Sequence, residues 1–208
     1  SGIYRVGGLE DFDCRNEKEG TKTLISRYRY DDYGQLLEMT DYRVSSETET
    51  AYRYTEYTYD QGGRITAFAE ISQNTQPTAD DIKAHQIRYT YNEDGNLSKV
   101  SYPTTQDGIQ SLSYIYDENG WLQEIKGELY SNGQTTEKVL RSYTYDTFGR
   151  LVKTVTTDYK KNDQTKTITY TYDNVGNRLK EDDGTTTTSY TYNGLDQLKT
   201  STKKKELR

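Results

Sequence analysis

The sequence predicts an all-β fold in which repeated antiparallel β-hairpins form one long, curved sheet. Three observations predict this class: tyrosines recur in pairs two residues apart, an Asp or Asn follows the second tyrosine, and a glycine usually comes three residues later. On an extended chain, residues two apart project from the same face, and tyrosine and threonine favour strands. The Asp or Asn starts a turn by accepting backbone N–H bonds, and the glycine supplies a positive φ.

The fifth copy of this motif shows how it specifies a hairpin. If residues 147–149 form a three-residue loop, the turn is of type I and closes with a glycine bulge at Gly149. Asp146 then lies opposite Arg150, and Tyr145 lies opposite Leu151, so that an aromatic and an aliphatic side chain share one face. The motif therefore predicts strand, turn, register and buried face together.

Seven copies follow one another at intervals of about 20 to 32 residues, a pattern typical of repeat proteins. A hairpin of this size cannot bury its own apolar face, so neighbouring repeats must stack. The sixth copy is expected to run one residue longer, to Leu179, and the seventh has Asp196 at the glycine position. The structural repeat motif consists of Tyr28, Tyr30, Asp31 and Gly34; Tyr57, Tyr59, Asp60 and Gly63; Tyr89, Tyr91, Asn92 and Gly95; Tyr114, Tyr116, Asp117 and Gly120; Tyr143, Tyr145, Asp146 and Gly149; Tyr170, Tyr172, Asp173 and Gly176; Tyr190, Tyr192 and Asn193.

Taken in order, residues 1–22 hold no complete copy and are expected to be an irregular lead-in or a partial repeat, and the array is expected over 23–208. Alternating runs at 36–44, 49–59 and 65–71 predict strands, the last with Ile65, Ala67, Ala69 and Ile71 on one face. The one helix is expected at 78–84, with Thr78 as its N-cap. The second, variable turn of each repeat is expected at 45–47, 103–108, 131–134, 161–163 and 182–184. About fourteen strands result, enough for an open sheet to coil on itself.

The composition decides what the core contains. Hydrophobic residues make up 31% of the chain, charged residues 29%, and 22 residues are tyrosine. Low hydrophobicity with many charges would suggest disorder, but regular aromatics can bury large apolar areas. We therefore expect a core, or one covered face, of tyrosine rings and single leucines rather than aliphatic clusters.

The same composition excludes several classes of function. A net charge of −6 argues against nucleic-acid binding, and no segment is apolar enough to cross a bilayer. Cys14 and His85 are single residues without partners at metal-ligand spacing, so no catalytic residue, metal site or cofactor is expected. Acids gather at the fixed turns, where Asx turns account for them, and the spacing of a known calcium loop is missing.

Trp121 is the departure from the repeat that we single out. It follows the glycine of the fourth copy, opposite Asp117, at a position held by Arg64 and Arg150 elsewhere. By register it should face away from Tyr116. An exposed tryptophan there would be a candidate contact residue, and a structural role is the alternative. Repeated aromatics can also stack on sugar rings or cations, so carbohydrate binding is a second hypothesis.

The motif, above all the run 172–179, resembles the YD repeats of the Rhs family, which are shared with teneurins and with the cocoon-forming subunits of insecticidal toxin complexes. The resemblance covers about residues 27–198. It implies a β-strip that winds into a hollow shell, which in bacterial polymorphic toxins encloses a C-terminal toxic domain and in teneurins belongs to an extracellular adhesion protein.

The resemblance also sets the expected partners. The aspartyl self-cleavage motif of many bacterial members, Asp-Pro-x-Gly, is absent, because neither proline follows an aspartate. We therefore expect a non-enzymatic segment of shell wall in a secreted or cell-surface protein, whose partners are the rest of the parent polypeptide and an enclosed C-terminal cargo. The alternative is an adhesin segment that binds carbohydrate or another ligand. Open sheet edges make dimerisation by strand pairing conceivable.

Overall fold

The computed structural model describes residues 2–6, 11–18, 21–45, 48–103 and 107–205. Its regular structure is almost entirely antiparallel β-strand, which confirms the all-β prediction. The chain forms two units, Ser1–Gln106 and Asp107–Arg208. In each unit, strands that follow one another in the sequence are neighbours in the sheet, as a stack of hairpins requires. That the long sheet coils on itself stays a prediction.

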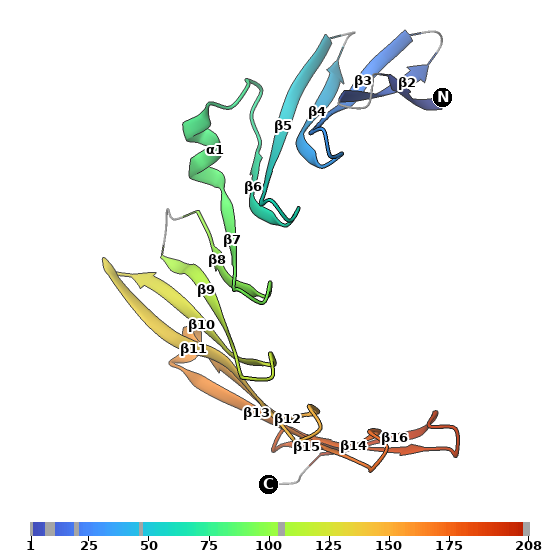
Figure 1. Cartoon of the computed structure of the whole chain (residues 1–208), viewed down its shortest axis with the longest axis vertical. Coiled ribbons are helices and arrows are strands. Elements are labelled where there is room, and N and C mark those ends of the chain that lie inside the picture. Colours follow the sequence, from blue (N-terminus) through green and yellow to red (C-terminus); the bar gives the residue numbers. More distant parts are fainter. Residues whose placement is uncertain (1, 7–10, 19–20, 46–47, 104–106, 206–208) are drawn as a thin grey trace. The chain divides into compact units, whose positions relative to one another are not determined.

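The first unit contains eight described strands and one helix, which Figure 1 shows in blue to green. Residues 1–22, expected to be a lead-in or a partial repeat, include a first strand that pairs with the second, and the second strand pairs in turn with the third. The helix lies between β6 and β7, which share only two residue pairs. The elements are β1 (Gly2–Val6), β2 (Asp11–Lys18), β3 (Thr21–Tyr30), β4 (Leu36–Ser45), β5 (Thr48–Tyr59), β6 (Ile65–Ile71), α1 (Ala79–His85), β7 (Ile87–Tyr91) and β8 (Leu97–Ser101).

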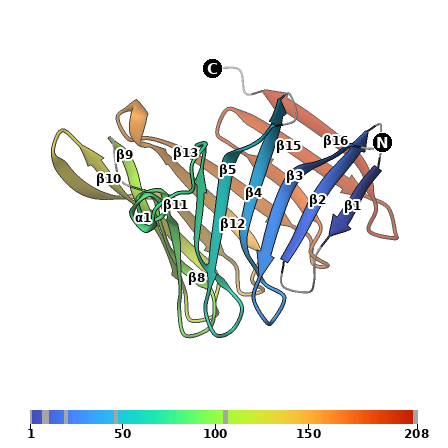
Figure 2. The ribbon, with the colours of Figure 1, turned by 90° about the horizontal axis from the view of Figure 1, so that it is seen from above.

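The second unit contains eight described strands and a short 3-10 turn, η1 (Tyr159–Lys161). Its strands are β9 (Gly108–Tyr116), β10 (Leu122–Ser131), β11 (Gln134–Tyr145), β12 (Leu151–Asp158), β13 (Gln164–Tyr172), β14 (Arg178–Asp182), β15 (Thr186–Tyr192) and β16 (Leu198–Lys205). In both units the fixed turns join an odd-numbered strand to the next even-numbered one, so within each unit the antiparallel order puts the fixed turns at the same end of the strands. Figure 2 shows this for the turns after β3 and β5.

The predicted register is confirmed in the fifth copy. Tyr145 pairs with Leu151, Asp146 N–H donates to the carbonyl of Arg150 at 3.0 Å, and Gly149 has φ +79°. One feature was not predicted: a second bulge follows, since Thr144 pairs with Lys153 and one residue between is left over. Every fixed turn is followed by such a register shift.

This second bulge overturns one expectation for β6. Ile65 pairs with Tyr59, whereas Ala67 pairs with Thr58. Neighbouring strand residues point to opposite faces, so Ile65 does not share a face with Ala67, contrary to the simple alternation. Ala67, Ala69 and Ile71 are 7%, 2% and 5% exposed.

The sixth copy also differs from its prediction. It is not one residue longer, because Asp173 N–H donates to the carbonyl of Asn177 in the same pattern as the other turns. Arg178 takes the leucine position opposite Tyr172, and Leu179 falls at the bulge, where it is 40% exposed. In the seventh copy Asp196 replaces glycine and adopts a φ of +58°.

The core is smaller and more aliphatic than the composition suggests. All fourteen motif tyrosines are half-buried, and none is fully covered. Among the residues whose burial the structure describes, the hydrophobic side chains below a tenth exposed are Leu24, Ala67, Ala69, Ile71, Val100 and Leu129. Among the described residues, the prediction that tyrosine rings form the core is therefore wrong, because every motif tyrosine is half-exposed. The alternative, one covered face of tyrosine rings, stays a prediction.

The helix and the variable turns follow the sequence signals. Thr78 caps α1, with its Oγ1 accepting from Asp81 N–H and the Asp81 carboxylate accepting in return. At the predicted Asn-Gly hairpin, Asn132 and Gly133 have φ values of +50° and +80°. Gly184 likewise has a positive φ. The expected turns at 45–47 and 103–108 lie partly outside the described residues.

Candidate functional site

The seven fixed turns share one backbone geometry, and their edge is the candidate site. In the second turn, Gly63 N–H donates to the carbonyl of Asp60 at 3.0 Å, and Asp60 N–H donates to the carbonyl of Arg64 at 2.9 Å. Asp60 Oδ1 also accepts the N–H groups of Gly62 and Arg64, at 2.9 and 3.0 Å. The short Asp side chain thus satisfies two loop donors, which is why Asp or Asn begins every copy.

The second carboxylate oxygen of the turn Asp takes a side-chain donor from the residue after the glycine. Arg64 Nε donates to Asp60 Oδ2 at 2.7 Å, and Arg150 Nε donates to Asp146 Oδ2 at the same distance. The amides of Gln35 and Asn177 do the same at 2.9 and 3.0 Å. This residue after the glycine is one that sequence reasoning missed, although a Gln, Arg or Asn in most copies was the available signal.

These contacts change the acidity of the turn carboxylates. The backbone N–H and then the guanidinium of Arg64 hold the pKa of Asp60 below its ordinary value. For Asp146, burial alone would raise the pKa, but the N–H groups of Arg150 and Phe148 and the Arg150 guanidinium together outweigh it, so the net pKa is lowered. These contacts therefore favour the anionic form of Asp60 and Asp146, the form that holds the loop.

Within each unit, a hydroxyl bond joins a fixed turn to the one before it. The second tyrosine of a copy donates its hydroxyl to the carbonyl of the residue two after the preceding glycine, so consecutive hairpins are tied at the turn edge. We call this bond the tyrosine rung. The described rungs are Tyr59 to Leu36 (2.8 Å), Tyr91 to Ile65 (2.8 Å), Tyr145 to Leu122 (2.9 Å), Tyr172 to Leu151 (2.7 Å) and Tyr192 to Arg178 (2.9 Å).

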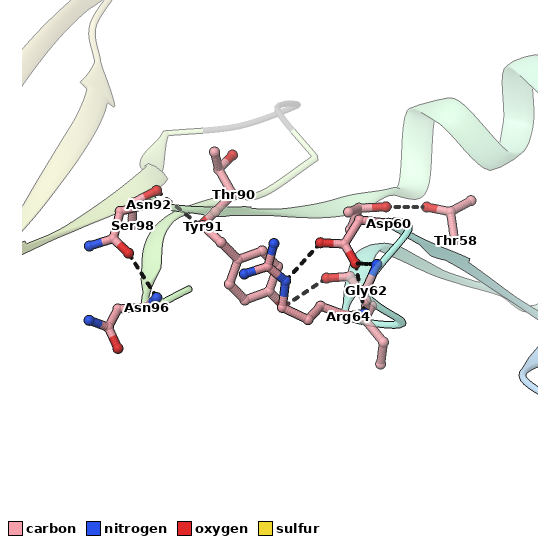
Figure 3. Close-up of polar contacts among 11 residues, drawn as sticks. Thr58, Asp60, Gly62, Arg64, Thr90, Tyr91, Asn92, Asn96 and Ser98 are labelled. Atoms are coloured by element: carbon pink, nitrogen blue, oxygen red, sulfur yellow. Dashed lines mark hydrogen bonds and ion pairs between the residues drawn. The ribbon is translucent and has the colours of Figure 1, made fainter. Parts of the chain in front are cut away.

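In the second and fifth turns, the side chain after the glycine reaches in the opposite direction, to the following turn. The Arg64 guanidinium lies 4.5 Å from the ring centroid of Tyr91, as Figure 3 shows beside its bond to Asp60. Arg150 lies 5.0 Å from the ring of Tyr172 and donates to the carbonyl of Asp173 at 2.7 Å. Rung and guanidinium together link neighbouring turns twice.

Trp121 takes this linking position in the fourth turn. Its ring lies 5.4 Å from the ring of Tyr145 in the next hairpin, tilted by 47°. A Cβ added to Gly149 would approach Trp121 Cζ2 to 2.7 Å, so only glycine fits beneath the indole. Trp121 is half-buried rather than exposed. It packs between two turns, and its role as a contact residue stays a prediction.

Two grooves lie between consecutive turns. In the first unit, a groove of about 800 Å³ runs between the first and second turns, beside Tyr33, Gln35 and Tyr59. In the second unit, one of about 500 Å³ runs between the fourth and fifth turns, beside Asn119, Trp121 and Tyr145. The lining residues occupy equivalent positions of the repeat, so the grooves follow from the stacking itself.

The other sequence candidates stay apart from this edge. The His85 ring Nδ1 lies 2.8 Å from the carbonyl of Asp81, at the end of its own helix, and Cys14 is a half-buried free thiol. Within the described residues, no three His, Cys, Asp or Glu side chains gather as metal ligands would. None of the described helices is long and apolar enough to span a bilayer.

The fold and the fixed turns together define an all-β repeat protein in which a turn geometry repeats from hairpin to hairpin. The family model described as Teneurin YD-shell matches residues 9–206. The match covers nearly the whole sequence, and the chain belongs to this family. No curated protein gives a match.

Solved structures resemble the chain more distantly. The TcdB2–TccC3–Cdc42 crystal structure is 16% identical, with 90% of this chain and 12% of that chain covered and a TM-score of 0.37. TcdB2–TccC3 without its hypervariable C-terminal region is 14% identical, with 93% and 13% covered and a TM-score of 0.38. The Tc holotoxin pore of Photorhabdus luminescens is 15% identical, with 87% and 12% covered and a TM-score of 0.28. The chain thus spans about an eighth of the length of these structures.

Proposed function

We propose that this chain is a non-enzymatic wall segment of a β-shell, which in its parent polypeptide helps to enclose a C-terminal cargo. The observation that carries the proposal is the turn edge: five described tyrosine rungs repeat one bond from hairpin to hairpin. Repetition of a tying contact supports a scaffold, because a catalytic centre needs a single convergent set of groups. The YD-shell family points to a secreted or cell-surface protein.

The half-buried tyrosine layer supports the same proposal. The half-exposed rings leave apolar surface in contact with water. Another layer of the parent polypeptide that packed against this surface would bury it and stabilise the sheet. The rest of that polypeptide is therefore the partner that we propose first, together with the cargo it encloses.

The experiment is protease protection of the cargo in the full-length parent polypeptide. We expect the C-terminal segment to resist limited proteolysis, and to become cleavable when Tyr59, Tyr145 and Tyr172 are changed to phenylalanine together. If the C-terminal segment is cut equally fast in both proteins while circular dichroism shows both to be folded, this wall is not what protects it. Replacing the corresponding first tyrosines, Tyr57, Tyr143 and Tyr170, is the matched control.

A ligand-binding role is the second candidate, and the two grooves between turns are what favours it. Each places aromatic rings beside turn acids or amides. Carbohydrate stays an untested ligand, and a glycan array probed with the intact chain tests it directly: a reproducible signal that vanishes with Trp121→Ala would support an adhesin.

Pairing through sheet edges also stays a prediction. The outermost strand of the second unit, β16, is exposed along its whole length and carries Lys199, Lys203, Lys204 and Lys205. Lysines on an edge strand oppose edge-to-edge association. Sedimentation across a concentration series decides the question, and a dimer would show that the lysines do not protect this edge.

A further inference from the structure

The fourth turn lacks a contact that the other Asp turns have. Five described turns begin with Asp, and in four of them the side chain after the glycine donates to Oδ2 at 2.7–3.0 Å. In the fourth, Asp117 Oδ1 accepts the N–H groups of Asn119 and Trp121, both at 2.9 Å. Trp121 has no donor placed on Oδ2, and in the described part of the chain no other residue supplies one. One charged oxygen is thus left to solvent or to a ligand.

The neighbouring repeats show which group normally fills this place. In the second and fifth turns it is a guanidinium, 2.7 Å from the turn carboxylate and stacked on the next tyrosine ring at 4.5 to 5.0 Å. In the fourth turn the indole of Trp121 lies on Tyr145 instead. Compared with the second and fifth turns, the fourth turn has a larger aromatic surface but no positive charge beside its Asp.

The place that lacks the charge is open. The groove of about 500 Å³ between the fourth and fifth turns includes Asp117, Asn119 and Trp121 in its lining. Its other acid, Asp146, is already paired with Arg150 at 2.7 Å. The carboxylate of Asp117 is therefore the groove's unpaired charge, and it lies beside an indole, the aromatic group that attracts cations most strongly.

We propose that this groove binds a guanidinium group supplied from outside, either on an arginine side chain of a polypeptide or on a small guanidinium compound. The guanidinium pairs with Asp117 Oδ2 and lies against the Trp121 ring, so that it completes the contact that Arg64 and Arg150 make within the chain. A planar guanidinium can do both at once, because it donates in its plane and stacks on its face. A compact ammonium would bind the acid but stack less well.

The chain contains a single tryptophan, so Trp121 fluorescence reports on this groove alone. The intact chain is titrated with N-acetyl-L-arginine amide and, separately, with the uncharged N-acetyl-L-citrulline amide. We expect a saturable change with arginine at a midpoint on the order of 10 mM, since one exposed ion pair and one cation–π contact together do not support tighter binding. Citrulline should bind at least about fivefold more weakly, since it lacks the charge.

Asp117→Asn is the decisive variant. Asn92 and Asn193 begin the third and seventh turns with the same backbone bonds, so this variant should keep its turn, which circular dichroism checks. We expect its arginine midpoint to rise about fivefold. Asp173→Asn is the matched control: it removes one negative charge from the same unit outside the groove, and should leave the titration unchanged.

Three results would overturn the proposal: no saturable change up to about 50 mM arginine amide, equal binding of citrulline, or equal binding by Asp117→Asn. The source of the group is decided by comparing a capped Gly-Arg-Gly peptide with methylguanidine. Tighter binding of the peptide indicates a polypeptide partner, and equal binding indicates a small compound. A neutral sugar that saturates the same signal independently of Asp117 would replace the guanidinium with a carbohydrate ligand.

Discussion

Removing one tyrosine rung tests whether the rungs hold the stack together. Tyr145→Phe deletes a single oxygen, the one that donates to the carbonyl of Leu122 at 2.9 Å, and leaves the ring in place against Trp121. A neutral hydrogen bond contributes about 0.5–1.5 kcal/mol to stability. Tyr145 is half-buried, and this burial raises the pKa of its hydroxyl. We therefore expect water to replace the lost donor incompletely. We expect the free energy of unfolding to fall by about 1 kcal/mol.

The control lies two residues away in the same strand. Tyr143 is also half-buried, but the described part of the chain offers its hydroxyl no hydrogen-bond partner, so Tyr143→Phe should change stability by less than about 0.5 kcal/mol. Urea unfolding followed by circular dichroism measures both. With a slope of roughly 1–3 kcal/mol/M, the midpoint of the rung variant should fall by about 0.3–1 M.

Equal losses of stability in the two variants, or no loss in Tyr145→Phe, would show that the tyrosine rung does not hold the hairpins together. An equal loss would mean that the two hydroxyls stabilise the fold only through their contacts with water, and that the bond to the carbonyl of Leu122 adds nothing. A second rung variant, Tyr192→Phe, should add its own loss of about 1 kcal/mol, because its rung to Arg178 shares no residue with the rung from Tyr145 to Leu122.

Two further predictions concern glycine and pH. Gly149→Ala should destabilise the chain by about 1–3 kcal/mol more than Gly120→Ala, because both positions have positive φ but only a Cβ at Gly149 would clash with Trp121. The urea midpoints of the two variants measure this difference. Equal losses of stability would contradict the packing contact. Burial raises the pKa of Tyr59 and Tyr172, so the folded state keeps phenol protons that the unfolded chain loses above about pH 10. The stability they contribute is present below pH 10 and is lost as the pH rises through the folded pKa, which urea midpoints at pH 9 and 11 measure; a double Phe variant with an unchanged pH dependence would refute this.

The sequence predicted the local geometry of the repeat well, because that geometry is set by neighbouring residues. An Asp that accepts loop N–H groups and a glycine with positive φ determine the turn wherever they occur, and so the register of Tyr145 with Leu151 followed. The cap of α1 at Thr78 was predicted for the same reason.

What the sequence did not predict depends on groups from different repeats. The second bulge is a property of strand pairing, and it moved Ile65 to the other face. The tyrosine rung joins a hydroxyl to a backbone carbonyl more than twenty residues away in most copies, as in Tyr59 to Leu36, and any residue can supply a carbonyl. Burial was misjudged for a related reason: how far a ring is covered depends on the layers around the sheet, which no motif encodes.

Departures from a repeat are the most informative positions in such a chain. In the turns with Arg64 and Arg150, the guanidinium pairs with the turn Asp and stacks on the tyrosine of the next repeat, so the chain itself supplies both contacts. Asp117 keeps the acid while Trp121 supplies no charge, so this turn alone among the described Asp turns leaves a carboxylate oxygen to solvent or to a ligand. If Trp121 were only a tolerated change in the repeat, Asp117→Asn would bind arginine as well as the unchanged chain does. If the groove is a binding site, Asp117→Asn binds arginine more weakly, and the titration distinguishes the two cases.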